Sequence, residues 1–319
     1  MKSGMKNWLI AAICLIITGC LLFVGGMTMM NWDFTKLATV TMETNEYIFA
    51  ENYRDIRIKT DVAHIELVLS EKSETAVVCR EHADRKHSVG IADGALVIEA
   101  EKTGKLYGLG LNFESEKITV YLPECAYGAL SVRNSTGGVK IPADFLFESI
   151  DISVTTGDIV NLASASDSVK LSANTGGVRI ADASMGELDI STTTGYVTVS
   201  GVACEGAASV KVSTGRTKLD GLTCKTFSSA GSTGAIELKD VIAREKLSIT
   251  RSTGDIRFDG CDAGEIFAKT GTGDISGSLL TDKVFFAETD TGRVKLPRTT
   301  SGGECELHTG TGDITLEIG

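Results

Sequence analysis

Hydrophobic and polar residues alternate with a period of two along most of the chain after residue 125. Counted from a recurring glycine as position zero, apolar residues occupy positions −7, −5, +2 and +4, and often +7. In the first, fourth and seventh units these residues are Leu130, Val132, Val139 and Ile141; Leu188, Ile190, Val197, Val199 and Val202; and Leu247, Ile249, Ile256, Phe258 and Cys261. Successive side chains of a strand point to opposite faces. The pattern therefore predicts two short strands per unit, each with one inward face, and a third inward corner.

A Thr-Gly pair marks every unit, and its copies are 19 or 20 residues apart. A fixed period of this length is the signature of a solenoid. We expect an all-β, single-stranded parallel β-solenoid (β-helix) of about ten 19–20-residue rungs, spanning residues 126–319. The predicted rung corners are Thr136, Gly137, Thr156, Gly157, Thr175, Gly176, Thr194, Gly195, Thr214, Gly215, Thr233, Gly234, Thr253, Gly254, Thr272, Gly273, Thr291, Gly292, Thr311 and Gly312.

The corner residues have distinct expected roles. The glycine suits a sharp bend that demands positive φ. The threonine before it has the parity of the inward residues, so we expect its hydroxyl to bond to the backbone and its methyl group to pack. Parallel stacking of the rungs at ~4.8 Å would place like residues on one another.

The region 31–125 is less regular and is interpreted as a β-rich N-terminal cap that covers the first rung. Thr60 to Ile65 resembles a degraded repeat corner, and Lys102 to Asn112 is the expected loop. The strands expected in this region are Asp55 to Lys59, His64 to Leu69, Ala76 to Arg80, Ala95 to Glu99 and Lys117 to Leu122.

Residues 8–30 form an uncharged, mostly apolar stretch with the length of a transmembrane helix. Lys2 and Lys6 place residues 1–7 in the cytoplasm as a short tail and send the body outside. The expected location is therefore the cell membrane, with a single pass, an extracytoplasmic body and the bilayer as a partner of residues 8–30. A cleaved signal peptide, or a lipid anchor at Cys20 within Ile17-Thr18-Gly19-Cys20, remains an alternative.

Composition agrees with short strands and many tight turns, because the chain has 35 Gly, 3 Pro and 6% aromatic residues. Charge excludes one class of partner. The residues after the first thirty contain all 42 acidic side chains and 29 basic ones, and such a surface repels nucleic acid. We expect no nucleic-acid partner.

The apolar N-terminal segment, the following Trp32-Asp33-Phe34 and the corners Ser252-Thr253-Gly254-Asp255-Ile256 and Thr272-Gly273-Asp274-Ile275 resemble a known family. It is the bacterial β-strand-repeat family of unknown function described as putative adhesins, which includes LiaG-like proteins of Gram-positive envelope-stress operons. The resemblance implies an extracytoplasmic solenoid involved in adhesion or envelope-stress sensing, and no catalytic residues. Several corners lack the Asp and carry Gly138, Gly177, Tyr196, Arg216, Ala235 or Arg293 instead.

The sequence offers candidates for two kinds of chemical site. Asp255, Asp274 and Asp290 are the candidate acid and base of a β-helix enzyme, but corner carboxylates that accept turn amides are the better interpretation. Cys79, His82 and His87 could contribute soft metal ligands, but their loose spacing favours a polar loop. We expect no enzyme activity, no cofactor and no metal.

The eight cysteines include two in the apolar segment. Cys204 and Cys224 are twenty residues apart, within plausible disulfide reach on adjacent rungs. Their offsets from the following glycine, −11 and −10, differ by one, so a ladder of small residues is the better interpretation. Cys125, Cys261 and Cys305 are expected to fill the core.

The leading functional hypothesis is a non-catalytic binding or scaffolding rod of the cell envelope that binds an envelope protein or glycan. The alternatives are an envelope-stress component that acts through a membrane partner and, less favoured, a carbohydrate-active enzyme. The last rung in sequence, near Glu304 to Ile318, is expected to be frayed or used for end-on association.

Overall fold

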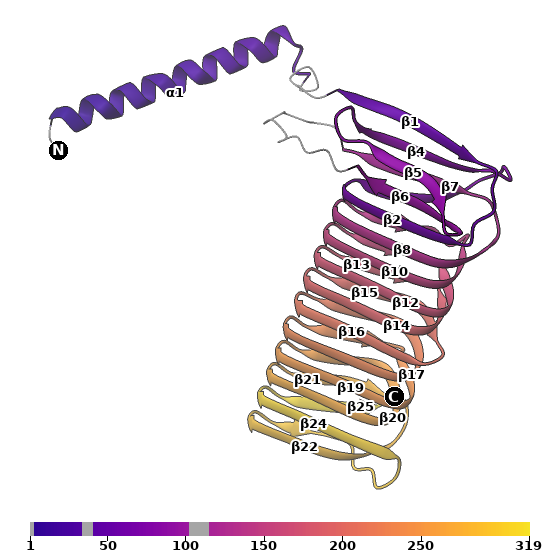
Figure 1. The fold of residues 1–319 in the computed structure, drawn as a ribbon. Helices are drawn as coiled ribbons and strands as arrows, with labels where there is room; N and C mark the ends of the chain where they lie inside the picture. Colours follow the sequence, from indigo (N-terminus) through magenta and orange to yellow (C-terminus); the bar gives the residue numbers. More distant parts are fainter. Residues whose placement is uncertain (1–2, 34–40, 102–114) are drawn as a thin grey trace.

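The computed structural model describes residues 3–33, 41–101 and 115–319, and within them it contains one helix and 25 strands. Helix α1 (Ser3–Met29) begins the chain and projects from the rest (Figure 1). Its segment Trp8–Met29 is long and apolar enough to cross a membrane. Almost all of its described side chains are exposed, as expected for an apolar helix without a protein partner.

The strands stack into a rod with two main faces, here called face A and face B (Figure 1). The strands of face A, in spatial order, are β6 (Ala95–Ala100), β2 (Asp55–Val62), β8 (Ala126–Thr136), β10 (Leu146–Thr156), β12 (Ser164–Thr175), β14 (Ser184–Thr194), β16 (Ala207–Thr214), the end of β17 (Thr217–Thr233), β19 (Ile242–Thr253), the end of β20 (Ile256–Thr272), β24 (Gly303–Thr311) and β22 (Lys283–Thr291).

Face B follows each corner. Its strands, in the same order, are β7 (Lys117–Leu122), β3 (His64–Leu69), β9 (Val139–Ile141), β11 (Ile159–Asn161), β13 (Val178–Ala181), β15 (Val197–Cys204), the start of β17, β18 (Ile236–Lys239), the start of β20, β21 (Ile275–Leu279), β25 (Ile314–Ile318) and β23 (Val294–Lys295).

The parallel register stacks like residues and so forms the core. Ile152 lies beside Leu171, which lies beside Ile190, and all three are fully buried. All fourteen residues that the period-two pattern assigned to the interior in the first, fourth and seventh units are buried. The predicted fold class, an all-β parallel solenoid preceded by an apolar helix, is confirmed.

The ten corner glycines share one conformation and one contact. Their φ angles lie between 119° and 157°, a region that L side chains rarely adopt. Each also packs directly on the backbone of the neighbouring rung: a Cβ on Gly215 would lie 1.5 Å from the carbonyl oxygen of Gly195. The corner therefore requires glycine for two independent reasons.

The corner threonines do not have the predicted orientation. All ten are exposed, and it is their backbone carbonyls that are used: Gly137 N–H donates to the Thr156 carbonyl at 2.9 Å. The inward polar position lies two residues earlier. There the hydroxyl of Thr270 donates to the Gly254 carbonyl at 2.9 Å and that of Thr309 to the Gly273 carbonyl at 2.8 Å. Parity was misassigned because the bend begins before the threonine.

The solenoid begins before residue 126. Strands β2 and β3 form a rung that meets at Ala63, whose N–H donates to the Thr136 carbonyl, so the degraded corner is confirmed. Strands β6 and β7 continue the stack in parallel. Beyond them β5 (His87–Ala92) pairs with β6, and β4 (Thr75–His82) pairs with β7 and β1 (Met42–Phe49), all antiparallel. The sequence predicted neither β1 nor β5, and the predicted loop Lys102 to Asn112 lies outside the described residues.

The other end of the rod departs from the sequence order. Strands β24 and β25 insert between the β20–β21 rung and the β22–β23 rung. The rung at the open end is therefore Lys283 to Lys295, and β24 and the first two residues of β25 are paired on both sides. The prediction that the last rung in sequence is the free one is wrong, because the loop after β23 lets the chain return into the stack.

Candidate functional site

A groove of about 930 Å³ lies on the outer side of face B, where the first rungs meet β4 and β7. Outward-pointing residues line it because alternate side chains of β3, β4, β7 and β9 face solvent. They include His64, Glu66, Arg80, Lys117 and Lys140. In the sequence, these residues are the polar half of alternating strands, and nothing in that pattern marks them as site residues.

Charge in the groove is organised around one carboxylate. The ammonium groups of Lys117 and Lys140 donate to the two oxygens of Glu66 at 2.8 and 2.9 Å. These hydrogen bonds hold the pKa of Glu66 below its usual range. On the same wall, His64 Nδ1 accepts the N–H of Gly138 at 3.1 Å. The groove is open and carries more positive than negative charge, so it is suited to binding an anionic group and not to enclosing a reaction.

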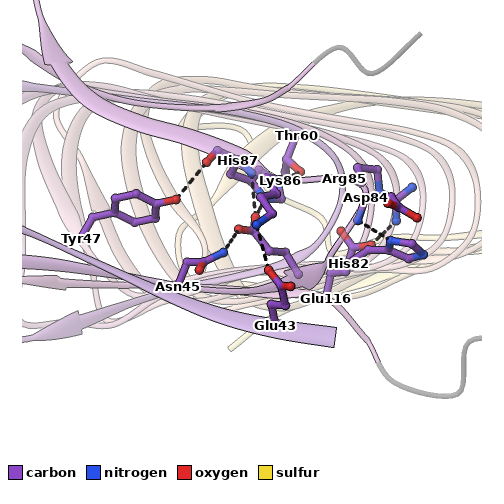
Figure 2. Close-up of polar contacts among 11 residues, drawn as sticks. Glu43, Asn45, Tyr47, Thr60, His82, Asp84, Arg85, Lys86, His87 and Glu116 are labelled. Atoms are coloured by element: carbon purple, nitrogen blue, oxygen red, sulfur yellow. Dashed lines mark hydrogen bonds and ion pairs between the residues drawn. The ribbon is translucent and has the colours of Figure 1, made fainter. Parts of the chain in front are cut away.

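A second polar cluster is buried between β1, β4 and β5 (Figure 2). Glu81 is fully buried. One of its carboxylate oxygens accepts the His87 N–H at 2.7 Å and lies 2.6 Å from His87 Nδ1; the other accepts from the Asn45 amide at 2.7 Å. His87 Nε2 lies 2.8 Å from the Thr60 hydroxyl. Every member has a partner, as a stable buried polar network requires.

Two of the three metal-ligand candidates from the sequence, Cys79 and His87, lie at this cluster, and His82 does not. Ligand atoms of Cys79, Glu81 and His87 lie within 4.8 Å of one another. However, the oxygens of Glu81 and both ring nitrogens of His87 already have hydrogen-bond partners. Burial, with a contribution from Glu81, raises the pKa of the Cys79 thiol to about 12, which disfavours a thiolate ligand. These three side chains are therefore better suited to stabilising the packing of the cap strands than to binding a metal ion. His82 points elsewhere, its Nδ1 accepting the Asp84 N–H at 3.0 Å.

The corner carboxylates form a structural ladder. Asp255 accepts the N–H of Asp274 at 2.9 Å, and Asp274 accepts the N–H of Asp313 at 2.8 Å. Asp313 in turn accepts the N–H and the guanidinium of Arg293, each at 2.9 Å, which lowers its pKa. Asp290 lies two residues before its corner glycine and is exposed. Carboxylates that fix neighbouring amides in this way serve the turn and leave no paired acid and base over a cleft.

All eight cysteines lie in the described residues, and their thiols are free. Ala203 pairs with Thr223, so the next residues, Cys204 and Cys224, share a column on adjacent rungs without being joined. Burial raises the pKa of Cys224 to about 12, which makes it a poor nucleophile. Cys261 and Cys305 are buried as expected, whereas Cys125 is exposed.

Three solved structures similar to this chain come from Parabacteroides distasonis and Bacteroides fragilis. A putative adhesin from Parabacteroides distasonis is 14% identical, with a TM-score of 0.49, over 74% of this chain and 98% of its own. A putative adhesin from Bacteroides fragilis is 17% identical, with a TM-score of 0.40, over 87% and 97%. A putative lipid binding protein from Parabacteroides distasonis is 15% identical, with a TM-score of 0.36, over 88% and 98%.

No curated protein sequence matches this chain. A family model, in contrast, matches residues 53–317, which extend from just before β2 into β25, the last strand of the chain. The matched residues contain the Thr-Gly corners and the inward alternation that build the rod. This chain belongs to the Toastrack DUF4097 family.

Proposed function

We propose that this protein is a membrane-anchored, extracytoplasmic β-solenoid that binds and scaffolds a component of the cell envelope without catalysing a reaction. The observation that carries the proposal is the open groove on face B. Its charged side chains project from strands that are hydrogen-bonded on both sides, so a ligand meets a preformed surface at little entropic cost. The family membership and the adhesin-like neighbours agree with a binding role.

The anchor rests on helix α1. Its segment Trp8–Met29 has the length and composition to cross a bilayer, and the basic residues before it favour a body on the outer side. Protease added to intact protoplasts is expected to remove the solenoid while the anchor stays with the membrane fraction. Full protection of the solenoid would contradict the orientation, and quantitative release of an untreated body into the medium would indicate a cleaved signal peptide.

Binding is tested by crosslinking on intact cells. A photocrosslinking amino acid at Lys140, in the groove, is expected to capture an envelope component, whereas one at Lys170, on face A, serves as the matched control. Equal capture at both positions would contradict a role for the groove. Capture of a sensor protein of the membrane would favour the envelope-stress function.

A further inference from the structure

A column of cations runs along the outer side of face B. The position three residues after each corner glycine points to solvent, and the strand register stacks these positions: Arg179 lies beside Thr198, which lies beside Lys218. The column, in spatial order, is Lys140, Val160, Arg179, Thr198, Lys218, Glu237, Arg257, Ser276, Thr315 and Lys295. From Lys140 to Arg257 a cation occurs on every second rung, about 10 Å apart at the usual strand spacing.

The middle of this column carries more positive than negative charge, with Arg179, Lys218 and Arg257 against Glu237. Arg179 and Lys218 are exposed, as is Arg216 in the adjoining corner column, and no carboxylate of the described residues lies within ion-pair distance of any of the three. Carboxylates on neighbouring rungs are Asp158, which accepts the Gly177 N–H at 2.7 Å, Asp220, which lies 4.0 Å from the Lys239 ammonium, and Glu237, which the register places beside Lys218. A local excess of positive charge stands out on a chain with a net charge of −11.

An aromatic side chain, Tyr196, lies in the corner column next to this one. Tyr196 is 50% exposed and occupies the corner next to Arg216. A Cβ built on Gly177 would lie 2.2 Å from Tyr196 Cζ and 2.5 and 2.6 Å from its two Cε atoms. Nearly equal distances of this kind place the Cβ above the plane of the ring, so the ring covers Gly177 with its face and not its edge. Because Gly177 has no side chain, the Tyr196 ring can pack directly on its backbone, and this packing site is called the Tyr196 seat.

We propose that Tyr196, Arg179, Arg216 and Lys218 form a subsite for a linear acidic glycan built from uronic-acid units, which lies along the rod. The solvent-facing side of the tyrosine ring offers a stacking platform for the apolar face of a sugar ring. The guanidinium groups offer the planar, two-pronged donors that suit a carboxylate. The inference rests on the proposed binding function and specifies its ligand class.

The regular spacing of cations along the column favours a polymeric ligand over a small anion. The spacing of two rungs is comparable to the length of a disaccharide unit in an extended glycan, so carboxylates on alternate sugars can meet successive cations without bending the chain. An extended acidic peptide would offer charges at a similar spacing but no sugar face for Tyr196. The tyrosine is therefore the residue that separates a glycan from a generic polyanion.

The test measures binding of a defined oligogalacturonate to the full-length protein in detergent micelles by isothermal titration calorimetry. The wild-type protein is expected to bind it and to bind the fully methyl-esterified form of the same oligomer at least about tenfold more weakly. Tyr196→Ala and Arg216→Gln are each expected to weaken binding of the acidic oligomer by about tenfold or more. Lys170→Gln, which removes an exposed cation from face A, is the matched control and should leave binding unchanged.

Gly177→Ala tests the platform without removing the aromatic ring. Its Cβ would displace the Tyr196 ring, so binding of the oligomer should fall towards the Tyr196→Ala level while thermal unfolding stays close to wild type. Inorganic polyphosphate serves as the polyanion without sugar. The proposal is overturned if wild type does not bind the oligogalacturonate, or if Tyr196→Ala weakens oligogalacturonate and polyphosphate binding equally or not at all.

Failure here can be told apart from failure of the proposed function. If the protein does not bind the oligogalacturonate but still captures an envelope component at Lys140, the binding role stands and the ligand belongs to another class. Failure of both experiments would remove the binding role itself.

Discussion

The backbone N–H of Gly273 donates to the carbonyl of Thr311, 2.9 Å away, although Thr291 is the next corner threonine in the sequence. The rung that carries Thr291 lies one step further out, where Gly312 N–H donates to its carbonyl at 3.0 Å. Two rungs have therefore exchanged places relative to sequence order. On face A, the unpaired strand edge at this end of the rod therefore belongs to β22 and not to β24.

Hydrogen exchange should reveal this order. Backbone amides of β24, paired on both sides, are expected to exchange as slowly as those of β20, whereas the amides on the free edge of β22 should exchange faster. Mass spectrometry of peptides from full-length protein measures both. Faster exchange in Gly303 to Thr311 than in Lys283 to Thr291 would contradict the arrangement.

The same edge is the expected place for end-on association between copies. Phe286 and Val294 are exposed there, at 55% and 46%, on a rung without a cover, and free edges pair readily with other strands. Phe286→Lys combined with Val294→Lys should reduce concentration-dependent dimerisation in sedimentation. Tyr121→Lys, at an exposed aromatic residue near the other end, is the control. Monomeric wild-type protein at high concentration would refute the association.

Aspartate substitutions at inward and outward positions should differ in their effect on the free energy of unfolding. Ile190 and Val197 are 0% and 1% exposed, so aspartate at either site buries an unpaired carboxylate and is expected to cost about 4 kcal/mol or more in the free energy of unfolding. Thr198→Asp, on the outer side of the same rung, should change it by about 0.5 kcal/mol or less. Denaturant titration monitored by circular dichroism compares the three, and equal stabilities would show the assignment to be wrong.

A corner glycine should tolerate no side chain. Gly215→Ala combines positive φ with a Cβ that would lie 1.5 Å from the Gly195 carbonyl oxygen, so two rungs must separate locally. We expect a loss of at least about 2–3 kcal/mol. Gly90→Ala is the control, because its Cβ would meet no atom within 4 Å. A Gly215→Ala variant as stable as Gly90→Ala would mean that the corner is far more plastic than its packing indicates.

A guanidinium lies inside the rod. Arg251 is 3% exposed, and its Nη2 donates to the hydroxyls of Ser229 and Thr217 at 2.9 and 3.3 Å, with no carboxylate of the described residues in ion-pair distance. Burial lowers the pKa of Arg251 to about 10, so the group is still charged at neutral pH.

Replacing this charge with an apolar chain of similar length should stabilise the fold. Arg251→Met is expected to raise the free energy of unfolding by about 1–4 kcal/mol, because it removes a buried charge and keeps most of the packing beside Gly231. Arg251→Ala, which leaves a cavity, should gain less or lose stability. A drop in the melting temperature of Arg251→Met below wild type would show that the hydroxyl partners fully compensate the desolvation.

The groove and the Tyr196 seat depend on contacts that no local pattern encodes. Glu66 meets Lys140 across 74 residues, and Gly177 accommodates Tyr196 from the next rung. In the sequence, Gly177 and Tyr196 read only as corners that lack the usual Asp. Their complementarity becomes visible once the register places them on adjacent rungs.

The sequence by itself determined the rod. A period of 19 or 20 residues repeats an alternation in which each inward side chain is apolar, and a parallel stack is the arrangement that buries all of these faces at once. Tertiary structure decided what repetition leaves open: which way the corner threonines face, and which of the last two rungs is outermost. Near-identical rungs have near-identical pairing edges, so local sequence cannot fix their order. The connecting loops and the fit of non-repeating side chains decide it.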